Sequence, residues 1–270
     1  MRKFLLLFAA ITCAVFVGCS KDDGGNGKSI SCSINISDGG IIYNNEPASI
    51  SVNITGDASE VVSVDFYIDG ELAKSVFASP FTYNATLKDL STGTHSINAV
   101  VKCADNSTCQ SEDNFTFKVK AGDDYQGGII ISTQDELSGI IAAKNDLTGG
   151  TLGRYKYGSY RDYGAYSMDD GLANTDKFNG TASGDYAAFA CLEFELNGYD
   201  DWYLPAFNEI ALFEDYLQEL NIPERSGYKY WTSTESSEND TKAYSYGFGV
   251  SIGNPFDKQE LLRVRPVRRF

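Results

Sequence analysis

Apolar and polar residues alternate in the first part of the chain, in short segments separated by turn-forming residues. Residues 49–54 show this period of two, and residues 62–68 show it again before Asp69-Gly70, a dipeptide typical of tight hairpins. Similar segments follow at residues 81–87, 95–103 and 114–119. Strands at this spacing predict an all-β sandwich over residues 28–121.

The pattern changes after residues 122–127, a short polar segment that we interpret as a linker. Residues 128–132 predict an apolar strand, and residues 134–146 fit a short helix or an irregular loop. Residues 149–184 are rich in Gly, Tyr, Asp and Asn and show no sustained period. A structureless loop of this length is uncommon in a compact domain unless it is functional.

Two helices are predicted in the last third of the chain. Residues 183–197 form the first, and its apolar face consists of Tyr186, Phe189, Ala190 and Phe194. The second begins near Pro205, a residue that suits a first helical turn. Its core-facing residues are Ile210, Phe213, Tyr216 and Leu217. Strand-like segments follow at residues 230–235, 243–252 and 261–268, so this half predicts an α+β domain.

Residues 1–18 have the organisation of a signal peptide. Arg2 and Lys3 supply a positive start, and residues 4–17 form an apolar run that is short for a transmembrane helix. The small residue before Cys19 resembles a bacterial lipobox, in which the Cys is acylated and the chain is cut before it. We therefore predict lipidation of Cys19; a plain secretory peptide with an incidental Cys is the alternative.

Residues 19–27 are predicted to form a flexible tether, because Gly and Asn bury little apolar surface. The acidic segment 20–23 resembles the surface-export signal of Bacteroidetes lipoproteins. We expect an outer-membrane lipoprotein exposed at the cell surface. If these charges only solvate the tether, the periplasmic face remains open as an alternative.

The chain is acidic, and its charge narrows the choice of partners. The formal charge is −15, and loss of Arg2 and Lys3 with the signal peptide changes it to −17. An acidic surface repels phosphate backbones, so we expect no nucleic-acid partner. Membrane contact is expected through the N-terminal lipid alone.

The chain contains six cysteines, and their positions allow more than one pairing. Cys13 leaves with the signal peptide, and Cys19 carries the lipid. The others are Cys32, Cys103, Cys109 and Cys191. Cys103 and Cys109 flank a turn-like insert, so a cross-hairpin disulfide is the candidate in an oxidising compartment. Pairing of Cys32 with either of them, and buried thiols, are the alternatives.

Residues 64–70, 79–83 and 90–100 resemble the bacterial Ig-like domain family, and this resemblance extends over about 90 residues. Such modules are usually stalks or spacers, so the resemblance implies a spacer here. His95 is the only histidine of the chain and lies within this match. We expect it to be a strand residue of the sandwich and not a catalytic group.

Three ordered motifs in the second half resemble the Lcl C-terminal domain family. They are residues 198–205 (Gly-Tyr-Asp-Asp-Trp-Tyr-Leu-Pro), residues 230–235 and residues 263–268. The resemblance implies a C-type-lectin-like fold for residues 128–270, and variable proteins of diversity-generating retroelements share the same ending. The predicted fold class is therefore an all-β Ig-like sandwich followed by an α+β C-type-lectin-like domain.

Enzyme chemistry finds little support in the sequence. The second domain has no histidine, which excludes Cys-His and Ser-His-Asp arrangements there, and no zinc-ligand spacing is present. Formylglycine-generating enzymes, which have a similar fold, use a pair of active-site cysteines, whereas this domain has only Cys191. We expect a protein without enzymatic activity and without a cofactor.

A calcium site is also unsupported, although acidic and amide side chains are frequent in the long loop. They are Asp162, Asp169, Asp170, Asn174, Asp176 and Asp185. Their spacing matches no EF-hand, and the Glu-Pro-Asn type motif of calcium-dependent lectins is absent. We predict no metal site and leave a structural calcium ion open.

Several large or charged residues of the second half are interpreted as structural. Trp202 and Trp231 are expected in the core. Three arginines alternate near the end of the chain and are expected on one side of a strand: Arg263, Arg265 and Arg268. We expect them to pair with Glu209 or Glu235 inside the fold.

The candidate binding surface spans residues 236–257. Its predicted ligand-binding residues are Glu238, Asn239, Asp240, Tyr244, Tyr246, Phe248, Asn254 and Asp257. Tyrosine offers a large contact area and a hydrogen-bonding group, which suits recognition. Packing of the alternating aromatic face into the core is an equal alternative.

The resulting hypothesis is a surface-anchored protein that binds a glycan or protein ligand without catalysis, as an adhesin or ligand-binding lipoprotein. The Ig-like domain would lift a rigid scaffold with variable loops away from the membrane. Two alternatives are a structural subunit or tip of a surface appendage, and a degenerate enzyme on a formylglycine-generating-enzyme-like fold.

Overall fold

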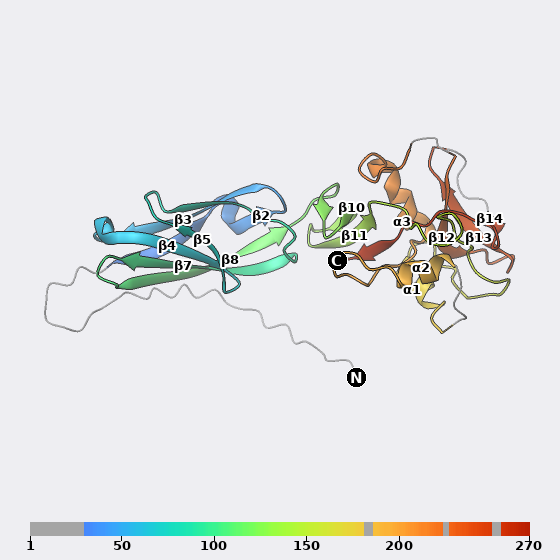
Figure 1. Cartoon of the computed structure of the whole chain (residues 1–270), viewed down its shortest axis with the longest axis horizontal. Helices are drawn as coiled ribbons and strands as arrows, with labels where there is room; N and C mark the ends of the chain where they lie inside the picture. The colour runs from blue at the N-terminus through green and yellow to red at the C-terminus, as the bar shows by residue number, and fades with distance from the viewer. Residues whose placement is uncertain (1–29, 181–185, 224–226, 250–254) are drawn as a thin grey trace. The chain divides into compact units, whose positions relative to one another are not determined.

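The computed structural model describes residues 30–180, 186–223, 227–249 and 255–270. The predicted signal peptide, the lipidation site Cys19 and the tether all lie outside the described residues. The chain divides between Lys118 and Val119 into two compact units (Figure 1). Within the described ranges, no helix has the length and apolarity needed to cross a membrane.

The first unit is built from strands with two short 3₁₀ turns. Its elements are β1 (Ser31–Ile36), η1 (Ser37–Gly40), β2 (Ile41–Tyr43), β3 (Pro47–Thr55), η2 (Ala58–Glu60), β4 (Val61–Ile68), β5 (Glu71–Val76), β6 (Thr82–Thr86), β7 (Gly93–Cys103) and β8 (Thr108–Lys118). One sheet has the order β1-β3-β6, and the other has the order β2-β8-β7-β4-β5. Strand β2 pairs with β8 in parallel, and the other pairs are antiparallel.

The predicted sandwich is confirmed, and burial alternates along β3 and β7, whereas β4 has four consecutive buried residues. In β7, every second residue from His95 to Cys103 is buried, which matches the period of two in the sequence. His95 accordingly lies inside the sandwich, with its Nδ1 2.6 Å from Asp69 Oδ2. The hairpin predicted at Asp69-Gly70 joins β4 to β5, and both residues have positive φ angles (49° and 85°), as a type I′ turn requires.

Strand register in the sandwich decides which cysteines meet. The predicted partners Cys103 and Cys109 are both buried, but the residue opposite Cys109 is Val101. Cys109 Sγ instead lies 2.7 Å from Cys32 Sγ. The described residues contain no disulfide, and the sulfur contact of Cys109 is with Cys32, not with the predicted partner Cys103.

The second unit mixes short strands and short helices. Its elements are β9 (Asp124–Tyr125), β10 (Gly128–Gln134), β11 (Ser138–Ala143), α1 (Gly171–Asp176), α2 (Ala187–Leu192), α3 (Phe207–Ala211), η3 (Leu212–Tyr216), β12 (Lys229–Glu235), β13 (Lys242–Gly247), β14 (Pro255–Asp257) and β15 (Val267–Arg269). Its two sheets have the orders β15-β11-β10-β9 and β12-β13-β14. Because β15 pairs with β11, the last strand of the chain closes on one of the first strands of the unit.

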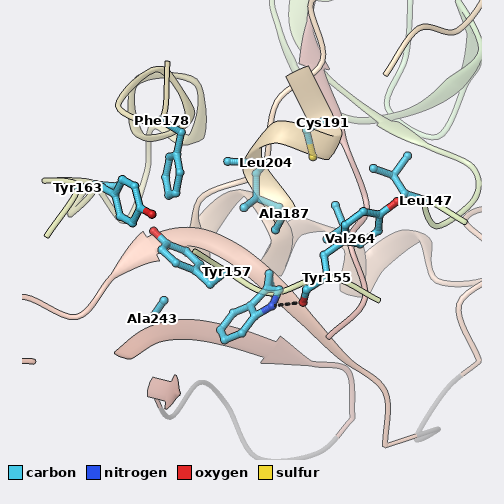
Figure 2. Packing of buried hydrophobic residues seen from close by; sticks show 13 residues of the cluster. Leu147, Tyr155, Tyr157, Tyr163, Phe178, Ala187, Cys191, Leu204, Ala243 and Val264 are labelled. Atoms are coloured by element: carbon cyan, nitrogen blue, oxygen red, sulfur yellow. Dashed lines mark hydrogen bonds between the residues drawn. The ribbon is translucent and has the colours of Figure 1, made fainter. Parts of the chain in front are cut away.

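Two apolar clusters form the core of this mixed α+β unit. The first contains Trp231, Tyr157 and Leu204, and the second contains Tyr203, Phe213 and Phe248. Figure 2 shows side chains from the first cluster converging from the irregular segments, α2 and the sheet. Trp202 and Trp231 are 1% and 0% exposed, as predicted.

Residues 134–146, predicted as a short helix or irregular loop, contain strand β11 instead. Asp135 and Glu136 have positive φ angles of 54° and 61°, and this left-handed pair reverses the chain between β10 and β11. The polar turn and the mixed residues of β11 do not give a clear period of two, so the sequence pattern missed the hairpin.

The helix predicted over residues 183–197 is shorter and faces another way. Helix α2 covers Ala187–Leu192, and residues 181–185 lie outside the described ranges. Its buried residues are Ala187, Ala188 and Cys191, whereas the predicted stripe is only half-buried. Small side chains allow α2 to approach the core closely, and a pattern that gives weight to bulky residues misses such a face. The second predicted helix is confirmed as α3 and η3, with Ile210 and Phe213 fully buried.

Arg265 and Arg268 lie inside the fold and Arg263 is half-buried, but all three have other partners than predicted. Arg263 and Arg265 bind Asp146 at 2.7 Å and 2.6 Å, and Arg268 binds Asp201 at 2.6 Å. The predicted acids have other partners: Glu209 binds Arg269, and Glu235 binds Lys258. Strand β15 begins only at Val267, so residues 263 and 265 precede it and the period of two does not place all three on one face.

Candidate binding surface

A buried ion pair lies at the base of the candidate surface. Glu235 is the last residue of β12 and Lys258 follows β14, and their side chains are 1% and 0% exposed. Lys258 Nζ binds Glu235 Oε1 and donates a 2.7 Å hydrogen bond to the carbonyl oxygen of Arg161. Charges removed from water are tolerated only when well-placed partners surround them, so the pair demands a fixed geometry.

The ion pair holds residues 158–166, which we name the tyrosine loop. Glu235 Oε2 accepts hydrogen bonds from the backbone N–H groups of Tyr163 (2.9 Å) and Ala165 (3.0 Å). At the start of the loop, the side chain of Gln259 donates to the carbonyl oxygen of Gly158 at 2.7 Å. Together with a 2.7 Å hydrogen bond from the backbone N–H of Glu235 to the carbonyl oxygen of Ala165, these bonds fix a backbone that forms no helix or strand of its own.

Aromatic rings support the tyrosine loop from the core. Tyr163 stacks on Phe178 with centroids 4.2 Å apart, and the ring of Tyr157 meets that of Phe178 edge-on at 5.5 Å (Figure 2). Lys258 Nζ lies 5.4 Å from the centroid of the Tyr163 ring, within cation–π range. Gly158 is required here, because a Cβ would lie 2.8 Å from the Tyr163 hydroxyl oxygen.

Two tyrosines of the same loop point to solvent. Tyr160 is 56% exposed and Tyr166 is 42% exposed, whereas Tyr163 between them is buried. The Tyr160 hydroxyl donates a 2.8 Å hydrogen bond to Asp257 Oδ1. A hydrogen bond with Asp162 raises the pKa of Tyr166 to about 12, so its phenol is protonated at neutral pH. Each exposed ring is thus held by a carboxylate.

The two carboxylates stay ionised at neutral pH. The hydrogen bond from Tyr166 and then the backbone N–H of Gly164 lower the pKa of Asp162. The backbone N–H of Gln259 and then the Tyr160 hydroxyl lower the pKa of Asp257. We name Tyr160, Asp162, Tyr166 and Asp257 the tyrosine surface. Its exposed rings offer apolar faces, and its carboxylates accept hydrogen bonds from hydroxyl groups of a ligand.

Part of the predicted surface lies beside these residues. Asp257 is one of them, and the charge of Asp240 contributes to the raised pKa of Tyr166. Glu238, Asn239 and Asp240 are exposed between β12 and β13. Asn239 Oδ1 accepts a 2.9 Å hydrogen bond from the backbone N–H of Thr241, so this side chain also shapes the turn.

The predicted ligand contacts are wrong for Tyr246 of β13 and for Phe248, which directly follows the strand. These side chains are 6% and 1% exposed and lie in the second apolar cluster. The reason is α3, whose Phe207 ring centroid lies 5.4 Å from that of Tyr246 and covers this face of the sheet. Tyr244 is half-buried, 5.8 Å from the same ring. Asn254 lies outside the described residues.

Tyr160 and Tyr166 were not predicted from the sequence. They lie in the long aperiodic segment 149–184, whose length and Tyr/Asp content were the available signal. Asp162 was considered there only as a calcium ligand. No local pattern distinguishes the exposed Tyr160 and Tyr166 from the buried Tyr163, because only tertiary contacts decide their burial.

A pocket elsewhere in the same unit provides a comparison. A pocket of about 610 Å³ is lined by residues that include Lys144, Asp146, Tyr155 and Phe194. Lys144 Nζ lies 2.6 Å from Asp124 Oδ2, and Asp146 binds Arg263 and Arg265. Lys144 and Asp146 therefore serve ion pairs within the unit, whereas the tyrosine surface presents its charges beside exposed rings.

Residues of the types that serve catalysis or metal binding are found in structural positions in the second unit. Cys191 is 0% exposed, and burial raises the pKa of its thiol well above the ordinary value, which keeps the sulfur protonated. Among the described residues, no group of three or more His, Cys, Asp or Glu side chains is arranged to hold a metal ion. Asp170, one of the calcium candidates, accepts a 3.0 Å hydrogen bond from the Ala173 N–H at the start of α1.

Comparison with known proteins identifies the first unit. Residues 32–99 match the model of the bacterial Ig domain family, so the chain carries a bacterial Ig-like domain followed by an α+β region. Curated proteins give no match. The fibronectin(III)-like modules of Clostridium thermocellum CbhA share 24% identity over 33% of this chain and 95% of theirs, with a TM-score of 0.26. SGBP-B of the Bacteroides ovatus mixed-linkage glucan utilization locus, in complex with a mixed-linkage heptasaccharide, shares 16% identity over 56% of this chain and 38% of its own, with a TM-score of 0.28.

Proposed function

We propose that this protein is a lipid-anchored cell-surface protein that binds a neutral glycan through the tyrosine surface and catalyses no reaction. The observation that carries the proposal is the pair of exposed tyrosines, each bonded to an ionised carboxylate and held by one buried ion pair. A rigid surface loses little conformational entropy on binding, which favours affinity.

The anchor and the spacer complete the design. Residues 1–19 have a lipobox-like ending, and the acidic residues after Cys19 support export to the outer face of the outer membrane. The Ig-like domain then serves as the spacer between the membrane and the second unit. Display of this kind requires only a stable sandwich, and no feature of the spacer has to take part in recognition.

We further propose that the second unit is an Lcl-type domain with a C-type-lectin-like fold. The motif over residues 198–205 supports this proposal, because it supplies Trp202, Tyr203 and Leu204 to the core. The pairing of β11 with β15 joins a strand from the start of the unit to the strand at its end. The tyrosine loop and β12–β14 can then vary their exposed side chains without loss of the core.

The absence of catalysis is inferred from the state of the reactive groups. The Cys191 thiol is buried and protonated, and the second unit has no histidine. Burial raises the pKa of Glu209, but its carboxylate accepts hydrogen bonds from the backbone N–H groups of Ala206 (2.9 Å) and Gly171 (3.1 Å) and from the Tyr203 hydroxyl (3.0 Å). Because these hydrogen bonds occupy its carboxylate, we infer that Glu209 stabilises the start of α3 and does not transfer a proton.

The class of ligand follows from the chemistry of the surface. Exposed rings pack against the apolar faces of sugar rings, and ionised carboxylates accept hydrogen bonds from sugar hydroxyl groups. Four acidic residues outnumber the exposed Arg161 and Lys242 in this area: Asp162, Glu238, Asp240 and Asp257. The whole chain carries a formal charge of −15. Acidic glycans and phosphorylated ligands are repelled by such a surface, so a neutral glycan is the favoured ligand.

Binding of the chain from residue 20 onward to an array of neutral and acidic glycans tests this function. We expect binding to neutral glycans that is unchanged by EDTA. The double change Tyr160→Ala and Tyr166→Ala should weaken it at least about tenfold. Truncation of an aromatic hot-spot residue costs about 2 kcal/mol or more, and about 1.4 kcal/mol already corresponds to a tenfold loss. The matched Tyr160→Phe and Tyr166→Phe variant should lose less, since it keeps the rings.

Three results would contradict the proposal. Unchanged affinity of the double alanine variant would exclude the tyrosine surface as the site. Loss of affinity on Phe194→Ala would place the site in the 610 Å³ pocket. An array without any bound glycan, together with saturable binding of a purified host or bacterial protein, would favour the protein-ligand form of the hypothesis.

A second candidate, a structural subunit of a surface appendage, is favoured by the edge of the sandwich. Strand β5 lies at the edge of the five-stranded sheet, where Leu72 is 56% exposed, and Phe77 directly after it is 75% exposed. Exposed apolar edges are sites of strand addition between chains. Heat-stable oligomers in sedimentation experiments, abolished by Leu72→Lys, would support this candidate.

A further inference from the structure

The first and last long strands of the Ig-like domain meet at a pair of cysteines. Cys32 is the second residue of β1, and Cys109 is the second residue of β8, in the opposite sheet. Both side chains are buried, and their sulfur atoms lie 2.7 Å apart. This separation lies between the van der Waals contact distance of two sulfur atoms and the roughly 2.05 Å of a disulfide, so a small shift of the two side chains brings the sulfurs to bonding distance.

Cys103 does not compete for this contact. Cys103 is the buried last residue of β7 and follows Lys102, the last residue of that strand that pairs with β8. Its backbone N–H donates a 3.0 Å hydrogen bond to the carbonyl oxygen of Ser107. Cys109 lies opposite Val101, so Cys103 is displaced from it along the strand. The register therefore directs the Cys109 sulfur across the sandwich and not along the hairpin.

We propose that Cys32 and Cys109 form an inter-sheet disulfide that carries mechanical load through the Ig-like domain. The oxidant is a protein or low-molecular-weight disulfide of the compartment outside the cytoplasm. One thiolate attacks it, forms a mixed disulfide and releases one oxidant thiol. The second thiolate then displaces the other oxidant thiol, so two electrons leave the cysteines, two protons are lost and one S–S bond forms.

The load path follows from the positions of the two residues. In an anchored protein, a pull on the second unit acts between the chain before residue 30 and the chain after residue 118, and this part of the argument rests on the proposed function. With the bridge closed, tension passes from β1 through the sulfurs into β8. Residues 33–108, which include β3 to β7, bear no tension. The 77-residue separation, at about 3.3–3.6 Å per residue, is roughly 250–280 Å of chain that force cannot extend.

Peptide mapping without reduction tests the bridge directly. The chain is produced with its own signal sequence, so that it folds outside the cytoplasm, and is alkylated before digestion. We expect a linked pair of peptides that contains Cys32 and Cys109, with Cys103 and Cys191 alkylated. A link that involves Cys103, or alkylation of all four cysteines, would overturn the proposal. Either result leaves glycan binding by the second unit intact, so it is distinguishable from failure of the proposed function.

Stability and extension test the consequences. Cys32→Ala and Cys109→Ala should lower the melting temperature of the Ig-like domain by roughly 10–20 °C, whereas the matched Cys103→Ala should shift it far less. If the single variants fail to fold, addition of dithiothreitol to the unaltered chain provides the same comparison. In single-molecule stretching, dithiothreitol should lengthen the unfolding step of this domain by the roughly 250–280 Å given above. A step of the same length before and after reduction would exclude the bridge as a load-bearing bond.

Discussion

Replacement of Lys258 by Met is expected to lower the free energy of unfolding of the second unit by about 3–5 kcal/mol. The change removes the partner of Glu235 and leaves a carboxylate that is 1% exposed without its countercharge. It also removes the donor to the Arg161 carbonyl oxygen, so the tyrosine loop loses one of its attachments. Guanidinium unfolding followed by tryptophan fluorescence measures the effect, because Trp202 and Trp231 both lie in this unit.

Two control variants separate the ion pair from simple loss of volume. The double variant Lys258→Met and Glu235→Gln removes both charges, and we expect it to recover part of the lost stability. Lys242→Met changes an exposed lysine of β13 and should alter the free energy of unfolding by less than about 0.5 kcal/mol. Equal stability of Lys258→Met and the unaltered chain would show that the buried charges do not depend on each other. Glycan affinity should fall with Lys258→Met even where the unit remains folded.

Trp231→Ala is expected to have a comparable effect, with a loss of about 3–5 kcal/mol in the free energy of unfolding. The indole is 0% exposed and meets the Tyr157 ring at a centroid distance of 5.5 Å. Its Nε1 donates a 2.8 Å hydrogen bond to the carbonyl oxygen of Tyr155, the bond drawn as a dashed line in Figure 2. The alanine therefore leaves a cavity in the first apolar cluster and a buried carbonyl oxygen without this donor.

Trp231→Phe divides these two contributions. It retains most of the apolar volume and loses the hydrogen bond, so we expect a smaller loss of about 1–3 kcal/mol. Trp202 remains as the fluorescent reporter in both variants, and circular dichroism provides an independent measurement. A loss below about 1 kcal/mol for Trp231→Ala would show that the cluster collapses around the gap, contrary to the close packing described above.

The sandwich was predictable because apolar and polar residues alternate within the sequence of individual strands. Alternation in β3 and β7 records which face of each strand meets the other sheet, and Asp69-Gly70 supplies the backbone freedom for a type I′ turn. A period of two along one strand states burial directly. It does not state the register between strands, which is why the contact of Cys109 with Cys32 could not be chosen over Cys103.

The candidate site was only partly predictable for a related reason. Asp240 and Asp257 were identified in the segment that forms part of the surface, but the aromatic face of β13 was assigned to the ligand although α3 covers it. Tyr160 and Tyr166 were missed because their exposure depends on the Glu235–Lys258 pair, which joins positions 23 residues apart in the sequence. The hydrophobic period of a segment reports burial along that segment and does not report a contact with a distant residue.

By itself, the sequence determined the composition of the units and the local geometry of the strands and turns. It set the alternation of the sandwich and the acidic charge. The tertiary structure alone decided which cysteines meet, which arginine binds which acid, and which tyrosines of one loop face water. The physical reason is that burial and pairing arise from contacts between residues far apart in the chain, and these depend on packing and register, whereas hydrophobic period and backbone preference act within a few residues.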